Sequence, residues 1–91
     1  MFKFGLRRVV GDSMTPALAE NDLILVMRTK KYGVGNVVGF KFNNKILVKR
    51  ISEIKKSQYY VLGDNQKNSL DSRKLGWLNE GQIVFRVIHK F

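Results

Sequence analysis

One serine and one lysine are the residues of this sequence whose settings could support covalent chemistry. Ser13 lies in the stretch Gly11–Pro16, which has the composition of a tight turn before a short helix. A free hydroxyl attacks a carbonyl poorly, so Ser13 would need a neighbouring base and backbone N–H groups aimed at the oxyanion that forms. Taken alone, Ser13 is better explained as a turn residue.

Two residues could act as that base. His89 lies near the end of a strand pattern beside Lys90, where a surface histidine is the better explanation. Lys49 lies on a strand on which alternate side chains share a face, so Leu47, Lys49 and Ile51 point the same way. An amine between two aliphatic side chains loses solvation, which lowers its pKa, and a fall of roughly 2 to 4 units would make it a base near neutral pH. The alternative is a lysine that extends its ammonium group to water.

A third polar stretch, Gly63–Gly76, completes a set of three motifs. Ser13-Met14-Thr15-Pro16 matches the Ser-Met-x-Pro motif of the type I signal peptidase family, and Val48-Lys49-Arg50 matches its lysine motif. The third stretch reproduces its Gly-Asp-Asn-x-x-Asn-Ser-x-Asp-Ser-Arg-x-x-Gly motif, including Asn68. The three motifs occur in the order of that family, and the sequence resembles it over nearly its whole length.

This resemblance implies a serine–lysine catalytic dyad. Ser13 would be the nucleophile, Lys49 the general base, and Ser69 the residue that orients the lysine amine. The backbone N–H of Ser13 would bind the oxyanion. Asp71 and Arg73 would pair to hold the long loop, and Asp64 and Asn65 would fix its entry. Asp and Asn side chains bond nearby backbone and so fix turns, which agrees with this structural support of the site.

We expect a peptide substrate to add to a strand edge, at Arg7–Val10 or at Lys45–Val48. The residues expected to contact it are Val10, Gly11, Met14 and Leu47. The signal peptidases prefer small residues just before the bond that they cut. The partner expected from the resemblance is therefore a protein substrate with an N-terminal leader.

The apolar runs predict a mainly β fold, a small antiparallel domain of about six strands that spans residues 1–91. One short helix is expected at Pro16–Ala19, after the nucleophile, and a long loop at Gly63–Gly81. The continuous apolar run Leu23–Met27 predicts a strand buried on both faces. The other expected strands are Arg7–Val10, Val37–Phe42, Lys45–Ile54, Tyr59–Leu62 and Ile83–Ile88, with a hairpin turn at Asn43-Asn44.

Several features of larger signal peptidases are missing, including the inserted second domain and the N-terminal membrane anchors. The sequence thus resembles a compact soluble subtype, which includes the proteases that mature nickel-type superoxide dismutase. A self-cleaving regulatory domain of the LexA or UmuD kind remains an alternative. No DNA-binding helical domain precedes Ser13, and the Gly-Asp-Asn motif belongs to the signal peptidases, so we place it second.

Composition narrows the remaining possibilities. The sequence has no cysteine and one histidine, which excludes a thiol nucleophile and a multi-histidine metal site, and we expect no cofactor and no metal. Seventeen basic and 7 acidic residues give a net charge of +10, mostly as scattered lysines on solvated faces. This charge leaves open contact with an anionic membrane or a non-catalytic basic binding module, but we do not expect nucleic acid as a partner. No run approaches the roughly 20 apolar residues of a membrane span, and we expect a cytoplasmic protein.

Overall fold

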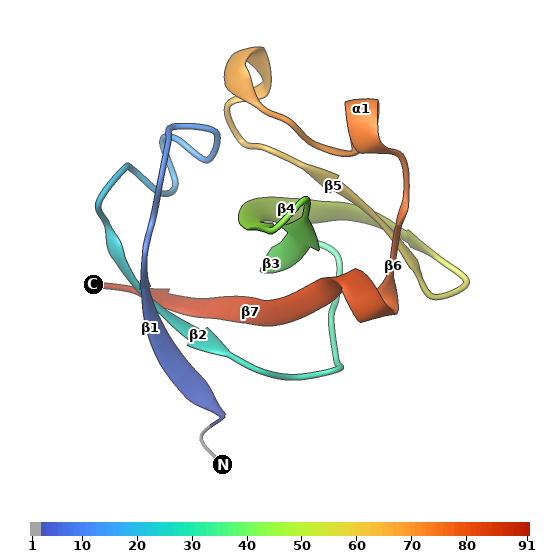
Figure 1. The fold of residues 1–91 in the computed structure, drawn as a ribbon, viewed down its shortest axis with the longest axis horizontal. Helices are drawn as coiled ribbons and strands as arrows, with labels where there is room; N and C mark the ends of the chain where they lie inside the picture. Colours follow the sequence, from blue (N-terminus) through green and yellow to red (C-terminus); the bar gives the residue numbers. More distant parts are fainter. Residues whose placement is uncertain (1–2) are drawn as a thin grey trace.

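The computed structural model describes residues 3–91, and the side chain of Asn68 lies outside the described part. Its seven strands form one sheet in the order β1-β2-β7-β3-β4-β5-β6, with every neighbouring pair antiparallel (Figure 1). The predicted class, a small and mainly β antiparallel fold, is confirmed. The strands are β1 (Phe4–Arg8), β2 (Leu23–Met27), β3 (Val37–Phe42), β4 (Lys45–Lys55), β5 (Gln58–Leu62), β6 (Leu78–Asn79) and β7 (Ile83–Lys90).

Two tight turns join β3 to β4 and β4 to β5. Asn43 and Asn44 have φ values of 46° and 63°, the positive values that a two-residue hairpin turn of the primed type requires. The turn predicted at these two asparagines is therefore present. Lys56 and Ser57 make the second turn with φ values of 47° and 65°. Neither residue type marks such a turn in a sequence, which is why it was not predicted.

The apolar core divides into two clusters. One lies along β3, β4 and β5 and consists of Val38, Phe40, Ile51, Tyr59, Val61, Leu78 and Ile83. The other lies where β2 and β7 meet the turn after β1 and consists of Val9, Met14, Leu18, Ile24, Val26 and Phe85. The ring of Phe85 lies across β3 at Gly39, where a Cβ would be only 2.2 Å from it, so only glycine fits there. Each fully buried apolar side chain contributes roughly 1.5–3 kcal/mol.

The sheet is curled (Figure 1), and residues of β1 and of β4 line one hollow. β1 is an edge strand that pairs with β2 alone. β4 pairs with β3 over Lys45–Arg50 and with β5 over Arg50–Lys55. The first half of β4 therefore has a strand partner on one side only, within residues 3–91. Both strand edges expected to receive a peptide face this hollow.

Two sequence predictions are wrong. The helix expected at Pro16–Ala19 is absent, and the chain after Ser13 forms successive turns. The Thr15 hydroxyl donates back to the carbonyl oxygen of Asp12 at 2.9 Å, a local hydrogen bond that competes with helix formation. β2 is buried on one face only, because Ile24 and Val26 point into the core while its other residues stay half-buried.

The expected loop Gly63–Gly81 contains short elements. They are the 3-10 turns Gln66–Asn68 and Glu80–Gln82, the helix α1 (Ser72–Leu75) and the strand β6. Asp71 caps α1 by accepting the Arg73 N–H, and Gly76 ends it with a φ of 79°. None of the helices in residues 3–91 has the length and apolar character to cross a membrane.

Candidate active site

Ser13 follows β1 on a turn that a later segment of the chain holds in place. Its carbonyl oxygen accepts the backbone N–H of Asn65 at 2.8 Å, and the Asn65 side chain donates to the carbonyl oxygen of Asp12 at 3.2 Å. The next residue, Met14, is 2% exposed, and its sulfur accepts the Asp64 N–H at 3.4 Å. The half-buried hydroxyl of Ser13 is thus carried on backbone fixed to the start of the polar stretch.

Lys49 reaches this serine from β4. Its register partner is Val38 on β3, and its side chain is among the buried ones, with 3% exposed. The Lys49 Nζ lies 2.7 Å from the Ser13 Oγ, across 36 residues of sequence. Burial lowers the pKa of Lys49 below its ordinary 10.5, and the negative charge of Asp71 partly opposes that fall. The structure therefore brings together the two residues predicted to form a dyad, and burial lowers the pKa of the lysine.

Asp71 is a fully buried carboxylate behind the lysine. It accepts the backbone N–H of Gly63 at 2.9 Å and that of Arg73 at 3.1 Å. The Arg73 guanidinium adds two donors, Nε at 3.0 Å and Nη2 at 3.1 Å. Burial raises the pKa of Asp71, but the hydrogen bonds of Arg73, Gly63 and Ser69 outweigh it and hold this pKa at about 2. Asp71 is thus a charged residue that ties α1 to the end of β5.

Ser69 lies beside this carboxylate. Its hydroxyl donates to Asp71 at 3.0 Å, and no hydrogen bond joins it to Lys49 among the described residues. A Cβ on Gly63 would stand 2.1 Å from the Ser69 Oγ and 2.8 Å from the carbonyl oxygen of Ser13, so Gly63 packs tightly between the two serines. The predicted role of Ser69 in orienting the lysine amine stays a prediction, and its contact in the structure is to Asp71.

Arg50 has a place in the site that the sequence did not reveal. Its Nε and Nη2 donate to the two carboxylate oxygens of Asp64 at 3.0 and 2.9 Å, and its Nη1 donates to the carbonyl oxygen of Gly35 at 2.8 Å. Such a two-point contact fixes the orientation of the Arg50 side chain and also contributes energy. The signal that could have found it is strand alternation, which turns Arg50 to the face opposite Lys49.

The hollow between β1 and β4 has Ser13 and Lys49 in its wall and a volume of about 210 Å³. Three of the four residues expected to contact a substrate also line it, namely Val10, Met14 and Leu47. The fourth, Gly11, does not line it, and lies on the exposed turn with a φ of 81°. We call this hollow the dyad groove. Its lining among the described residues is Arg7, Arg8, Val9, Val10, Ser13, Met14, Ile46, Leu47, Val48, Lys49 and Phe85.

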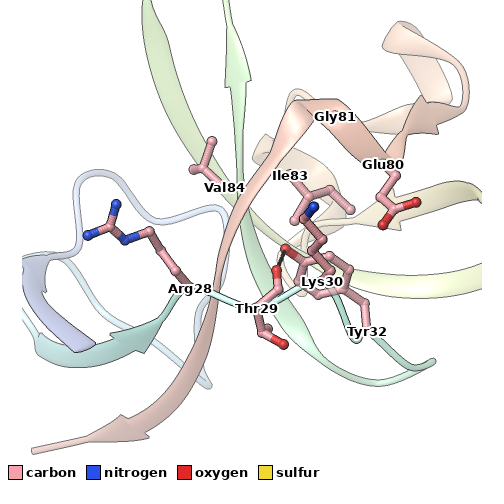
Figure 2. A pocket seen from close by; sticks show the side chains of 8 residues that line it. All are labelled: Arg28, Thr29, Lys30, Tyr32, Glu80, Gly81, Ile83 and Val84. Atoms are coloured by element: carbon pink, nitrogen blue, oxygen red, sulfur yellow. Dashed lines mark hydrogen bonds between the residues drawn. The ribbon is translucent and has the colours of Figure 1, made fainter. Parts of the chain in front are cut away.

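A larger and more open hollow, about 660 Å³, lies between the end of β2 and the start of β7 (Figure 2). The Tyr32 hydroxyl donates there to the Thr29 carbonyl oxygen, and burial raises the pKa of Tyr32. Glu80 and Lys30 also line it, whereas Figure 2 shows the Arg28 side chain turned away from Tyr32. None of the residues predicted for the site lines this hollow.

A small antiparallel β-domain that sets a buried lysine against a serine hydroxyl has the arrangement of a serine-peptidase-like protein. The family described as Peptidase S24-like matches residues 3–85, and the chain belongs to this family. The family fits a serine peptidase or a LexA/UmuD-like fold, and membership does not single out the type I signal peptidases. No curated protein matches the chain.

Proposed function

We propose that this protein is a serine endopeptidase that uses Ser13 as nucleophile and Lys49 as general base. The observation that carries this proposal is the contact of 2.7 Å between the Lys49 Nζ and the Ser13 Oγ, made by a lysine that is 3% exposed. A solvated surface lysine keeps its proton at neutral pH, whereas burial lowers the pKa of this one. The pair therefore has the distance that proton transfer requires, and burial shifts the pKa of Lys49 in the direction that a general base needs.

In the proposed reaction the neutral Lys49 takes the Ser13 proton as the oxygen attacks the scissile carbonyl carbon. The tetrahedral intermediate collapses to an acyl-enzyme, and the lysine gives its proton to the leaving amine. Lys49 then takes a proton from water as the water oxygen attacks the ester carbon. The bond between that carbon and the Ser13 oxygen breaks, the acid leaves, and Lys49 returns the proton to Ser13. The backbone N–H of Ser13 has no acceptor among the hydrogen bonds of the described turns and loops, which leaves it available for the oxyanion.

The proposed substrate is an extended peptide segment, cut after a small residue so that an N-terminal leader is removed. β1 and the first half of β4 each have one edge without a strand partner among the described residues, and a peptide can add to such an edge. The dyad groove, about 210 Å³, is smaller than the roughly 300–1,000 Å³ of ordinary ligand sites. Its size and apolar lining support a preference for small side chains near the cut.

The test is a digest of a mixed peptide library by the purified protein, followed by mass spectrometry. Ser13→Ala and Lys49→Met should each abolish cleavage, because each removes one member of the pair. Lys41→Met is the matched control, since it removes an exposed lysine and should cut at the wild-type rate. Full activity of Lys49→Met would refute the proposal.

A second candidate, self-cleavage of the LexA or UmuD kind, is favoured by the family match over residues 3–85. It uses the same pair on a segment of its own chain. Incubation of the purified protein at rising pH, with intact mass measured over time, separates the two. A Ser13-dependent loss of a piece of this chain, with no cleavage of added peptides, would favour the second candidate.

A further inference from the structure

We propose that the dyad groove selects substrates that carry an acidic side chain a few residues from the cut bond, and that Arg7 recognises it. This inference rests on the proposed endopeptidase function and specifies that the substrate carries a negative charge near the cut bond. It comes from the end of the groove away from Ser13, which the catalytic chemistry does not use.

Arg7 is held in a defined position beside the groove. Its guanidinium lies 6.0 Å from the centre of the Phe85 ring, whose face attracts cations, and its Nη1 donates to the carbonyl oxygen of Leu6 at 2.8 Å. The side chain folds back along β1 toward Gly5, where a Cβ would stand only 3.1 Å from Nη1. A glycine at that position leaves room for the guanidinium beside the groove.

The guanidinium of Arg7 has N–H donors left for a carboxylate, whereas Arg50 and Arg73 already bind one. A guanidinium carries five N–H donors in a fork that matches two carboxylate oxygens. Arg50 and Arg73 each use this fork on an aspartate of the protein, Asp64 and Asp71. No ion pair among residues 3–91 includes Arg7. An acidic side chain of a bound peptide would supply the missing partner.

The basic character continues past Arg7 into a second hollow of about 270 Å³, which Arg7 also lines. Lys3 and Arg28 lie along this second hollow, and Arg28 also lines the larger hollow, where Figure 2 shows its side chain pointing away from Tyr32. Within residues 3–91, no Asp or Glu lines either the dyad groove or this second hollow. The path that leads away from Ser13 is therefore lined by apolar and basic side chains alone, apart from Ser13 itself and Gly5.

The strand geometry places an acidic side chain within reach of Arg7. A peptide added to the edge of β1 or β4 runs along the groove and points alternate side chains to one face, advancing roughly 3.3 Å per residue. Arg7 and Val9 lie two residues apart on β1 and its extension, and both line the dyad groove with Ser13. A peptide whose scissile bond lies at Ser13 would thus pass Arg7 a few residues away.

The experiment uses one set of peptides in two assays. Each peptide has an alanine-rich sequence with a single Asp, Asn or Lys moved through successive positions. We expect wild-type protein to cut the best Asp peptide roughly threefold to tenfold faster than its Asn counterpart, as one charge pair in a half-open groove allows. Arg7→Gln should remove this preference and Arg7→Glu should transfer it to Lys peptides. Lys30→Gln, which removes one charge from the larger hollow, should keep it.

The second assay measures binding of the same peptides to Ser13→Ala by fluorescence anisotropy. Ser13-dependent cleavage without any preference for Asp would overturn this inference and leave the proposed function standing. Binding of Asp peptides that depends on Arg7, without cleavage by the wild-type protein, would support the inference and overturn the proposed function. Binding of a single-stranded oligonucleotide in place of the Asp peptides would assign the basic path to nucleic acid, against the inference.

Discussion

Replacing Asp71 by Asn tests whether a buried charge holds the polar stretch against the sheet. Asn keeps the shape of the side chain and removes the charge. The change weakens contacts with the backbone N–H groups of Gly63 and Arg73, the Arg73 guanidinium and the Ser69 hydroxyl. We therefore expect a less stable protein whose loss of stability depends on pH.

The size of the loss follows from the pKa of Asp71. This pKa is about 2, against an ordinary value of 3.8, and each pKa unit corresponds to about 1.4 kcal/mol. The difference of about 1.8 units gives roughly 2.4 kcal/mol as an upper value. The Arg73 side chain is 39% exposed, and solvent screening of that partner reduces the expected loss to roughly 1–2 kcal/mol at pH 7.

The pH dependence has a definite sign. Because folding lowers the pKa of Asp71, its charge stabilises the fold fully above pH 4 and loses that effect as the pH falls toward 2. The difference in urea unfolding free energy between wild type and Asp71→Asn should therefore shrink over that range. Glu53→Gln, which breaks an exposed ion pair with Lys55, is the matched control and should cost under roughly 0.5 kcal/mol. If the difference in unfolding free energy between wild type and Asp71→Asn stays constant from pH 7 to pH 2, the charge of Asp71 is not what stabilises the fold.

Two further substitutions test the site. Since the pKa of Lys49 lies below 10.5, Ser13-dependent cleavage should rise with pH and reach a plateau below that value. Lys49→Met should abolish cleavage, yet the variant should be at least as stable as the wild type near pH 7, because it removes a charge that burial disfavours. In urea unfolding, this gain in stability should disappear as the pH approaches 10.5. A midpoint of the pH–rate profile at the value of free lysine would contradict the buried amine. Gly63→Ala should lower stability by roughly 1–3 kcal/mol and impair cleavage, because its Cβ would stand 2.1 Å from the Ser69 Oγ. Gly33→Ala, whose Cβ would meet nothing closer than 3.8 Å, should leave thermal unfolding nearly unchanged, and equal melting temperatures for the two glycine variants would contradict this packing.

The sequence predicted the elements whose residues carry local signals. Leu23–Met27 and Val37–Phe42 are apolar runs of strand length, and β2 and β3 have these bounds. Asn43 and Asn44 tolerate the positive φ that their turn needs. Lys49 was predicted on an apolar strand face, and the structure buries it. These features depend on alternation and turn chemistry, which neighbouring residues largely determine.

The remaining features depend on contacts between distant residues. Nothing local to Thr15 indicates that its hydroxyl turns back to Asp12, and the helix predicted after the nucleophile failed for that reason. The short helix α1 has a local signal in its capping residue Asp71 and its terminal Gly76, but the surrounding polar residues are equally typical of a loop. The partner of Ser69 and the pairing of Arg50 with Asp64 follow from how the polar stretch folds over the sheet.

The position of β7 in the sheet has a consequence for biosynthesis. This strand is the last of the described chain, yet it lies between β2 and β3 and joins them. Ser13 follows the first strand of one half, and Lys49 belongs to the other half, so no ladder of strands connects them until Ile83–Lys90 has been made. Until then the Ser13 turn is joined to the half that contains Lys49 by the contacts of Asn65 and Asp64 rather than by a strand ladder. The order of synthesis thus leaves the joining of the two halves of the sheet to the last described strand, β7.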